Sequence, residues 1–358
     1  MERIQISVFG ATNSGKSTLV NTLCGQQVAL VSDKPGTTTD PVRKFIELPD
    51  IGACVLVDTA GYGDEGALGA ERERLTRGVV ESTDVALLLL SAHPEDVKWE
   101  ARLKDAGIPV VTLERHSLPE REILLKRIRE ALPAEAQRYL TGDLVRPGDT
   151  VVLVMPQDSE APKGRLILPQ VQLIRELLDR GCIPVCCTPA SVQGAMLRRP
   201  DLVITDSQVF RQVAAAIPAD CPLTSFSILL AASKGDIQVF LEGARAIDGL
   251  QPGARILIAE ACTHVPNTED IGREKIPALL RRNVPDLQVE IAAGNDFPED
   301  LGGYDLIIHC GACVAGSALV RARTEKALRA GVPITNYGLA IAALQGILGR
   351  VSIPSIRR

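Results

Sequence analysis

Eight residues near the start of the chain constrain its fold more than any other feature. Residues 10–17, GATNSGKS, fit the pattern G-x-x-x-x-G-K-S/T at every fixed position. They lie between an apolar run, Ile4–Phe9, and an amphipathic helical pattern, Ser17–Leu23. A glycine-rich loop between a strand and a helix wraps phosphate groups with backbone N–H groups, and the helix N-terminus adds partial positive charge. The sequence therefore predicts a P-loop NTPase fold for the first part of the chain.

The side chains of this loop have distinct predicted roles. Lys16 would reach the β- and γ-phosphates of a nucleotide, and the Ser17 hydroxyl would bind Mg²⁺. The remaining residues of the loop and its flank that we expect to contact the nucleotide are Gly10, Asn13, Ser14, Gly15 and Thr18.

Two further motifs follow in chain order. Residues 58–61, DTAG, end the apolar run Cys54–Val57, where an aspartate holds magnesium through water in Walker B-type sites. Residues 35–40, PGTTTD, lie between the two motifs. They would supply a threonine hydroxyl to Mg²⁺ and would order around the γ-phosphate as a switch. The predicted nucleotide-binding residues here are Thr37, Thr38, Asp58 and Gly61, and the predicted catalytic residues are Lys16, Thr38 and Asp58.

Together and in this order, the three motifs resemble the translation-factor-like GTPases of the TrmE–Era type. The resemblance implies GTP or another nucleoside triphosphate with Mg²⁺, and the asparagine at position 13 implies activation by K⁺. One motif departs from the pattern, because residues 114–117, ERHS, stand where the guanine-reading N-K-x-D should follow Val110–Leu113. The usual last strand also has no counterpart before the first block ends. We therefore expect reduced discrimination between GTP and ATP.

The whole chain alternates short apolar runs with helical patterns, which is typical of parallel α/β folds. Its 358 residues suggest two or three domains. Turn-rich stretches at 141–149 and 249–253 divide it into a nucleotide-binding domain (1–140), a second domain (141–249) and a third (250–358). Further predicted strands are Val85–Leu90, Val151–Met155, Ile183–Cys187, Leu202–Thr205, Arg255–Ala259, Leu287–Ala292, Asp305–His309 and Val332–Thr335. The other predicted helices are Arg121–Leu132, Pro169–Arg180, Ile271–Arg282, Ser317–Ala330 and Leu339–Leu348.

Composition excludes several classes of protein. A net charge of −5 argues against a general nucleic-acid or anionic-membrane binder, and 3% aromatic residues weaken any base-stacking role. The longest apolar stretches have six residues, against the roughly 18 that a transmembrane helix needs. The first residues lack a signal-peptide pattern, and nine cysteines are an odd number. We therefore expect a cytoplasmic protein with reduced thiols and neither nucleic acid nor membrane as a partner.

A cysteine–histidine constellation occupies the third block. Residues 262–264, CTH, follow one predicted strand, and residues 309–313, HCGAC, follow another, with 44 residues between the two groups. Because the carboxyl ends of parallel strands share an edge of the sheet, both groups should converge there, bordered by Asn336 and Tyr337. Three interpretations are open from residue types alone: zinc in a Cys₃His shell, a redox C-x-x-C pair, or an iron–sulfur cluster on Cys262, Cys310 and Cys313.

Long strings along nearly the whole chain resemble the [FeFe]-hydrogenase maturation proteins of the HydF family. Besides the motifs above, these are GDLV, EAPKGRLILPQVQ, PDLVITDSQ and PLTSFSILLA, then RILIAEACTH, DIGREKIP, DFPEDL, IIHCGAC and AGVPITNYGLAIA. The resemblance implies a [4Fe–4S] cluster on the three motif cysteines, with His264 or His309 as the fourth ligand or as a neighbour of the ligands. It also implies a transient diiron precursor, two radical-SAM maturases, the hydrogenase catalytic subunit as client, and a homodimer formed by the second domain. The chain departs at Val265, where the family commonly has a second histidine.

Two alternatives stand beside this interpretation. One is a regulatory NTPase with a structural zinc domain, and the other is a divergent paralogue that serves another metalloenzyme. For the remaining residues we expect packing roles: Trp99 partly buried, and Cys24, Cys54, Cys182, Cys186, Cys187 and Cys221 mostly buried as small hydrophobic residues. The arginines at 281, 282, 321 and 323 are expected on solvated helix faces.

Overall fold

The computed structural model describes residues 4–25, 42–63, 76–132, 139–157, 166–261, 270–294, 296–313 and 315–355. The chain forms two compact units, Met1–Ala136 with Gly316–Leu319, and Gln137–Ala315 with Val320–Arg358. None of the helices in these described ranges combines the length and the apolar character that crossing a membrane requires.

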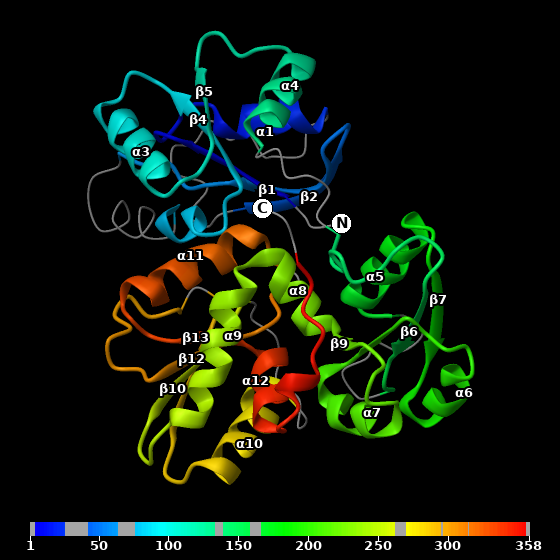
Figure 1. The fold of residues 1–358 in the computed structure, drawn as a ribbon. Helices are drawn as coiled ribbons and strands as arrows, with labels where there is room; N and C mark the ends of the chain where they lie inside the picture. Colours follow the sequence, from blue (N-terminus) through cyan, green and yellow to red (C-terminus); the bar gives the residue numbers. More distant parts are fainter. Residues whose placement is uncertain are drawn as a thin grey trace. The chain divides into compact units, whose positions relative to one another are not determined.

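The first unit is built on a five-stranded sheet in the order β2-β3-β1-β4-β5 (Figure 1). Its strands are β1 (Ile4–Gly10), β2 (Val42–Leu48), β3 (Gly52–Asp58), β4 (Val85–Leu90) and β5 (Val110–Glu114), and its helices are α1 (Lys16–Cys24), α3 (Pro94–Asp105) and α4 (Arg121–Ala131). All neighbouring strands pair in parallel except β2, which runs antiparallel to β3. In the described residues of this unit, no strand follows β5.

Alternation along β1 places its side chains in two cores, one on each face of the sheet. Ile6 and Val8 pack with residues of α1 and α4, whereas Phe9 packs with residues of α3. On that second face Trp99 is only 1% exposed and its ring lies 5.7 Å from that of Phe9. The expected packing role of Trp99 is therefore confirmed, with more complete burial than expected.

The second unit contains two four-stranded parallel sheets, ordered β7-β6-β8-β9 and β11-β10-β12-β13 (Figure 1). The first has strands β6 (Thr150–Val154), β7 (Ile183–Cys187), β8 (Leu202–Thr205) and β9 (Leu223–Ser225), with helices α5 (Leu168–Asp179), α6 (Val192–Met196), α7 (Phe210–Ala216) and α8 (Phe226–Lys234). Helix α9 (Ile237–Arg245) packs on the second sheet. The second has strands β10 (Arg255–Glu260), β11 (Gln288–Ala293), β12 (Leu306–His309) and β13 (Ile334–Asn336), with helices α10 (Ile276–Asn283), α11 (Ser317–Arg329) and α12 (Tyr337–Leu344). One π-helical turn, Ile271–Lys275, precedes α10, and short 3₁₀ turns cover Pro189–Ser191, Ser207–Val209, Ala246–Gly249 and Leu348–Arg350.

One hydrophobic core joins the two sheets of this unit. It contains Val152 and Val203 from the first sheet, Phe240 from α9, and Leu257 and Ile307 from the second sheet. Helix α9 packs closely on β13, because a Cβ atom at Gly243 would lie 2.0 Å from the carbonyl oxygen of Ile334. The predicted α/β class with mainly parallel sheets is confirmed, while the division of the chain at residues 140 and 249 stays a prediction.

Candidate functional site

The phosphate-binding loop has the geometry that its sequence predicts. It connects β1 to α1, and Gly15, the residue just before the helix, has φ 101°. Such a left-handed conformation favours glycine. Among the described residues no side chain caps the first N–H groups of α1. Uncapped N–H groups at a helix N-terminus are a suitable site for phosphate oxygens.

Two charged side chains and one hydroxyl meet at this loop. The Ser17 Oγ donates to Asp58 Oδ2 at 2.8 Å, which joins the start of α1 to the end of β3. The ammonium of Lys16 donates to the carbonyl oxygens of Gly10 and Ala11 at 3.0 and 2.8 Å and is almost completely buried. Burial raises the pKa of Asp58, and the hydrogen bond from Ser17 and the charge of Lys16 act in the opposite direction.

The segment after Asp58 packs directly on the phosphate-binding loop. The Thr12 N–H donates to the Tyr62 carbonyl oxygen at 3.0 Å, and a Cβ atom at Gly61 would lie 2.5 Å from the Thr12 Cα. Only glycine therefore permits this close approach. The hydroxyls of Thr12 and Ser14 are buried and have no hydrogen-bond partner among the described residues. Buried hydroxyls normally have partners, so these two fit a site that is completed by phosphate oxygens.

The structure brings most of the predicted nucleotide-binding residues together. The residues that meet around the loop are Gly10, Ser14, Gly15, Lys16, Ser17, Asp58 and Gly61. Asn13 and Thr18 are exposed beside them, and Thr37 and Thr38 lie at 26–41, outside the described residues. At the far end of the sheet, β5 ends at Glu114, and the Ser117 N–H donates back to the Glu114 carbonyl oxygen at 3.1 Å.

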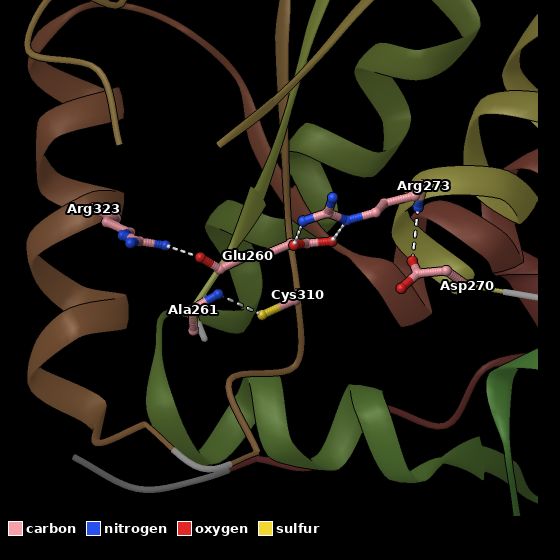
Figure 2. A network of polar contacts seen from close by, with 6 residues as sticks. All are labelled: Glu260, Ala261, Asp270, Arg273, Cys310 and Arg323. Carbon is pink, nitrogen blue, oxygen red and sulfur yellow. Dashed lines mark hydrogen bonds and ion pairs between the residues drawn. The ribbon is translucent and has the colours of Figure 1, made fainter. Parts of the chain in front are cut away.

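The second group of predicted site residues lies at the carboxyl edge of the sheet β11-β10-β12-β13. Ala259 of β10 is in register with His309 of β12, and His309 is in register with Asn336 of β13. The Ala261 N–H donates to Cys310 Sγ at 3.1 Å, as Figure 2 shows. Cys262 is the residue that follows Ala261 in the chain. Cys262 and His264 themselves lie at 262–269, outside the described residues.

The loop after β12 carries the two described cysteines of the motif. Cys310 accepts a second hydrogen bond from the Ala312 N–H at 3.4 Å, and Ala312 has a left-handed φ of 48°. Cys310 is half-buried and Cys313 is exposed. Two N–H groups directed at one sulfur stabilise its thiolate form. Among the described residues no group of three cysteine, histidine, aspartate or glutamate side chains gathers here. The two thiols, with Cys262 next to Ala261, fit the thiolate ligands that iron–sulfur clusters use.

His309 is the last residue of β12, directly before Cys310, and is 1% exposed. Its Nε2 is 3.2 Å from Nη1 of Arg323, and its Nδ1 is 2.7 Å from the Cys310 carbonyl oxygen. Arginine has no acceptor, so Nε2 accepts and Nδ1–H donates. Burial and the charge of Arg323 lower the pKa of His309 to about 3, so the ring is neutral. With both ring nitrogens engaged, His309 supports the Cys310 backbone in this arrangement.

The expectation for Arg323 was wrong. Instead of a solvated position it is 2% exposed, because it lies on the inner face of α11 with Val320 and Ala327. Its guanidinium donates to the carbonyl oxygens of Glu260 and Gly294 as well as to His309. The spacing Val320, Arg323, Ala327 matches one helix face, and that signal in the sequence places Arg323 inside.

An ion pair between a buried glutamate and a partly exposed arginine links the end of β10 to the turn Ile271–Lys275. Glu260, 1% exposed, binds Arg273 through both carboxylate oxygens, with Nη2 to Oε2 at 2.8 Å (Figure 2). The Arg273 N–H in turn donates to Asp270 Oδ1 at 2.8 Å. These contacts connect Glu260 and Asp270, which lie on either side of residues 262–269 in the chain. Residue types alone gave no reason to select Glu260 or Arg273.

The other cysteines mostly follow the expected packing role. Cys54 and Cys182 are buried, Cys24, Cys187 and Cys221 are half-buried, and burial raises the pKa of Cys54 to about 12. Cys186 is exposed, at an outward position of the edge strand β7, so for this residue the expectation of burial was wrong.

Comparison with family models decides where the chain belongs. Residues 140–235 match the hydrogen maturase F dimerization domain, and residues 238–354 match the hydrogen maturase F tetramerization domain. The chain belongs to the hydrogen maturase F family. Residues 5–115 match the model of a 50S ribosome-binding GTPase, which agrees with the predicted TrmE–Era-like first domain.

Curated relatives match about a quarter to a third of the chain. GTPase Der of Clostridium perfringens is 40% identical over 96 residues, which are 26% of this chain and 22% of that protein. GTPase Era of Xanthomonas axonopodis pv. citri is 40% identical over 111 residues, 30% of this chain and 37% of that one. The tRNA modification GTPase MnmE of Myxococcus xanthus is 38% identical over 115 residues, which are 31% of this chain and 25% of that protein. The chain thus spans well under half the length of these relatives.

Among solved structures, Aquifex aeolicus Era is similar over 89% of this chain and 100% of its own. The identity is 15% and the TM-score 0.29, a level at which the similarity does not bear on the fold.

Proposed function

We propose that this chain is an [FeFe]-hydrogenase maturation factor that carries a [4Fe–4S] cluster on Cys262, Cys310 and Cys313. The observation that carries the proposal is the pair of N–H groups, from Ala261 and Ala312, that donate to Cys310 Sγ at a sheet edge where Cys262 is the next residue. Membership of the hydrogen maturase F family supports it. When bound, the cluster supplies iron at which a diiron precursor attaches, and that precursor is the cargo received from two radical-SAM maturases and delivered to the hydrogenase.

The chain's own residues have three tasks at this site. The thiolates of Cys310 and Cys313, with Cys262, hold the cluster, and a ligand set with only three cysteines leaves one iron open to cargo. The buried pair His309 and Arg323 fixes the backbone beside Cys310. His264, two residues after Cys262, remains a proposed fourth ligand or neighbour of the ligands.

In the first unit we propose that Lys16, Ser17 and Asp58 bind and hydrolyse GTP with Mg²⁺. Lys16 would leave the carbonyl oxygens of Gly10 and Ala11 for the phosphates, and Ser17 would exchange its hydrogen bond to Asp58 for Mg²⁺. Thr37 and Thr38 complete the proposed site, with K⁺ near Asn13. Hydrolysis would regulate the exchange of partners by a cytoplasmic homodimer.

Metal analysis of the whole protein tests this function. After anaerobic reconstitution we expect about four irons and four sulfides per chain, and after reduction an electron paramagnetic resonance signal of a [4Fe–4S]⁺ cluster. Mixing this loaded protein with the apo-hydrogenase, after exposure to the two maturases, should activate the hydrogenase. One tightly bound zinc per chain, with no capacity for iron and sulfide, would instead favour a structural zinc domain.

A further inference from the structure

A buried lysine from the dimerization region reaches the cysteine loop. Lys234, the last residue of α8, is 5% exposed. Its ammonium donates to the carbonyl oxygens of Ala312 and, at 2.8 Å, of Ala315. These two carbonyls lie on either side of Cys313 in the chain. Lys234 thus binds the part of the loop that presents this cysteine.

The same helix contacts the sheet edge at its other end. The Asn336 Nδ2 donates to the Ser227 carbonyl oxygen at 2.9 Å and to its Oγ at 3.1 Å. Asn336 is the register neighbour of His309. Helix α8 lies within residues 140–235, whereas the loop and β13 lie within 238–354. The cysteine loop is therefore supported by a helix from the other matched domain.

The charge of Lys234 has a specific consequence. Burying an ammonium group costs free energy unless hydrogen bonds and negative charge offset the loss of hydration. The carbonyl dipoles of Ala312 and Ala315 supply part of that offset. The ammonium also restrains the loop, in which Ala312 has the unfavourable φ of 48°. A [4Fe–4S] cluster bound by three thiolates is an anion, and its negative charge grows on reduction. The ammonium is thus placed where it stabilises a loaded site more than an empty one.

We propose that Lys234 is a positioning residue that holds the Cys310–Cys313 loop in its ligand geometry and stabilises the reduced form of the bound cluster. This inference rests on the proposed function. It adds a role for α8 beyond association of the chains, because the dimerization region supplies part of the cluster's surroundings.

Substitution of Lys234 in the full-length protein tests the proposal. Lys234→Met keeps the length of the side chain and removes the charge and its hydrogen bonds. We expect the reconstituted variant to bind the cluster with a more negative midpoint potential and to lose iron to a chelator about tenfold faster, the effect of losing one hydrogen bond to a charged group. Lys234→Arg, which keeps the charge, should retain the wild-type potential. Lys98→Met, an exposed lysine in the other unit, should alter neither quantity.

The outcomes separate the inference from the function on which it rests. If wild type takes up the cluster and Lys234→Met has the same potential and the same rate of iron loss, the inference is wrong and the carrier function stands. If Lys234→Met does not fold, Lys234→Arg decides, and a shift to a more negative potential in that variant overturns the role of the charge. If wild type itself takes up no cluster, the proposed function fails and the inference fails with it.

Discussion

The hydroxyl of Ser17 lies 2.8 Å from the carboxylate of Asp58, although 41 residues separate them in the chain. The contact forms because β1 and β3 are parallel neighbours, so that α1 begins beside the end of β3. Both side chains are oxygen donors of the kind that Mg²⁺ prefers. The fold thus places the predicted phosphate-binding loop and the predicted magnesium aspartate in one site.

Replacement of Lys16 by alanine should abolish nucleotide hydrolysis. The ammonium is the one side-chain cation in the glycine-rich loop, and loss of such a group at a developing charge lowers turnover about a hundredfold or more. Phosphate release measured with Lys16→Ala, and with Lys98→Ala as an exposed control, checks this. Iron content should stay at the wild-type level in both variants. Normal hydrolysis by Lys16→Ala would show that the loop is not the nucleotide site.

Guanine selectivity should be weak in the wild-type protein and should rise when an aspartate is restored. Residues 114–117, at the end of β5, stand at the place of the guanine-reading N-K-x-D motif. Ser117 occupies its fourth position, where an aspartate would accept hydrogen bonds from guanine N1 and N2. In competition binding, Ser117→Asp should favour GTP over ATP more strongly than wild type does, whereas Glu122→Asp on α4 should not. A wild-type preference for GTP above about a thousandfold would show that other residues read the base.

Two glycines of the second unit should respond to alanine in opposite directions. Gly243→Ala forces α9 away from the Ile334 backbone, so the free energy of unfolding should fall by about 1–3 kcal/mol. Gly194 lies in α6 with open space around it, so Gly194→Ala should raise that free energy by about 0.5–1 kcal/mol. Urea unfolding followed by circular dichroism measures both. Equal effects of the two variants would contradict the close packing of α9 on β13.

Features formed by residues adjacent in the chain could be predicted from the sequence, whereas several features that depend on distant contacts could not. The phosphate-binding loop and β1 follow from adjacent residues and were predicted within one residue. The parallel sheet order then brings Cys310 beside Ala261, as expected from strand ends. Strand β2 was missed because it is an edge strand whose exposed Phe45 and Val42 give no clear alternation.

The charged residues of the cysteine site could not be predicted in the same way. Arg323, Lys234 and Glu260 are of types that normally face water, and their burial depends on partners distant in the chain. For Arg323 the apolar residues at helical spacing offered a signal. For Lys234 the partners are backbone carbonyls of a loop 78 residues away, and no pattern in the sequence reports such a contact.

His309 should affect the cluster without holding it. The His309 Nε2 accepts from Arg323, and its Nδ1–H donates to the carbonyl oxygen of Cys310. His309→Ala should therefore keep about four irons per chain while changing the electron paramagnetic resonance spectrum. His116→Ala, an exposed loop histidine of the first unit, should leave the spectrum unchanged. A loss of iron from His309→Ala as complete as that from a cysteine variant would mean that His309 is itself a ligand.

The most direct test of the carrier function is the iron content and electron paramagnetic resonance spectrum of single cysteine variants after anaerobic reconstitution. We expect Cys262→Ser, Cys310→Ser and Cys313→Ser each to lose the [4Fe–4S]⁺ signal and hydrogenase activation together, because a cubane held by three thiolates does not survive with two. Cys186→Ser, an exposed cysteine at the edge strand β7, should retain both. If any of the three variants still binds four irons and matures hydrogenase, the assignment of the cluster to these cysteines is wrong.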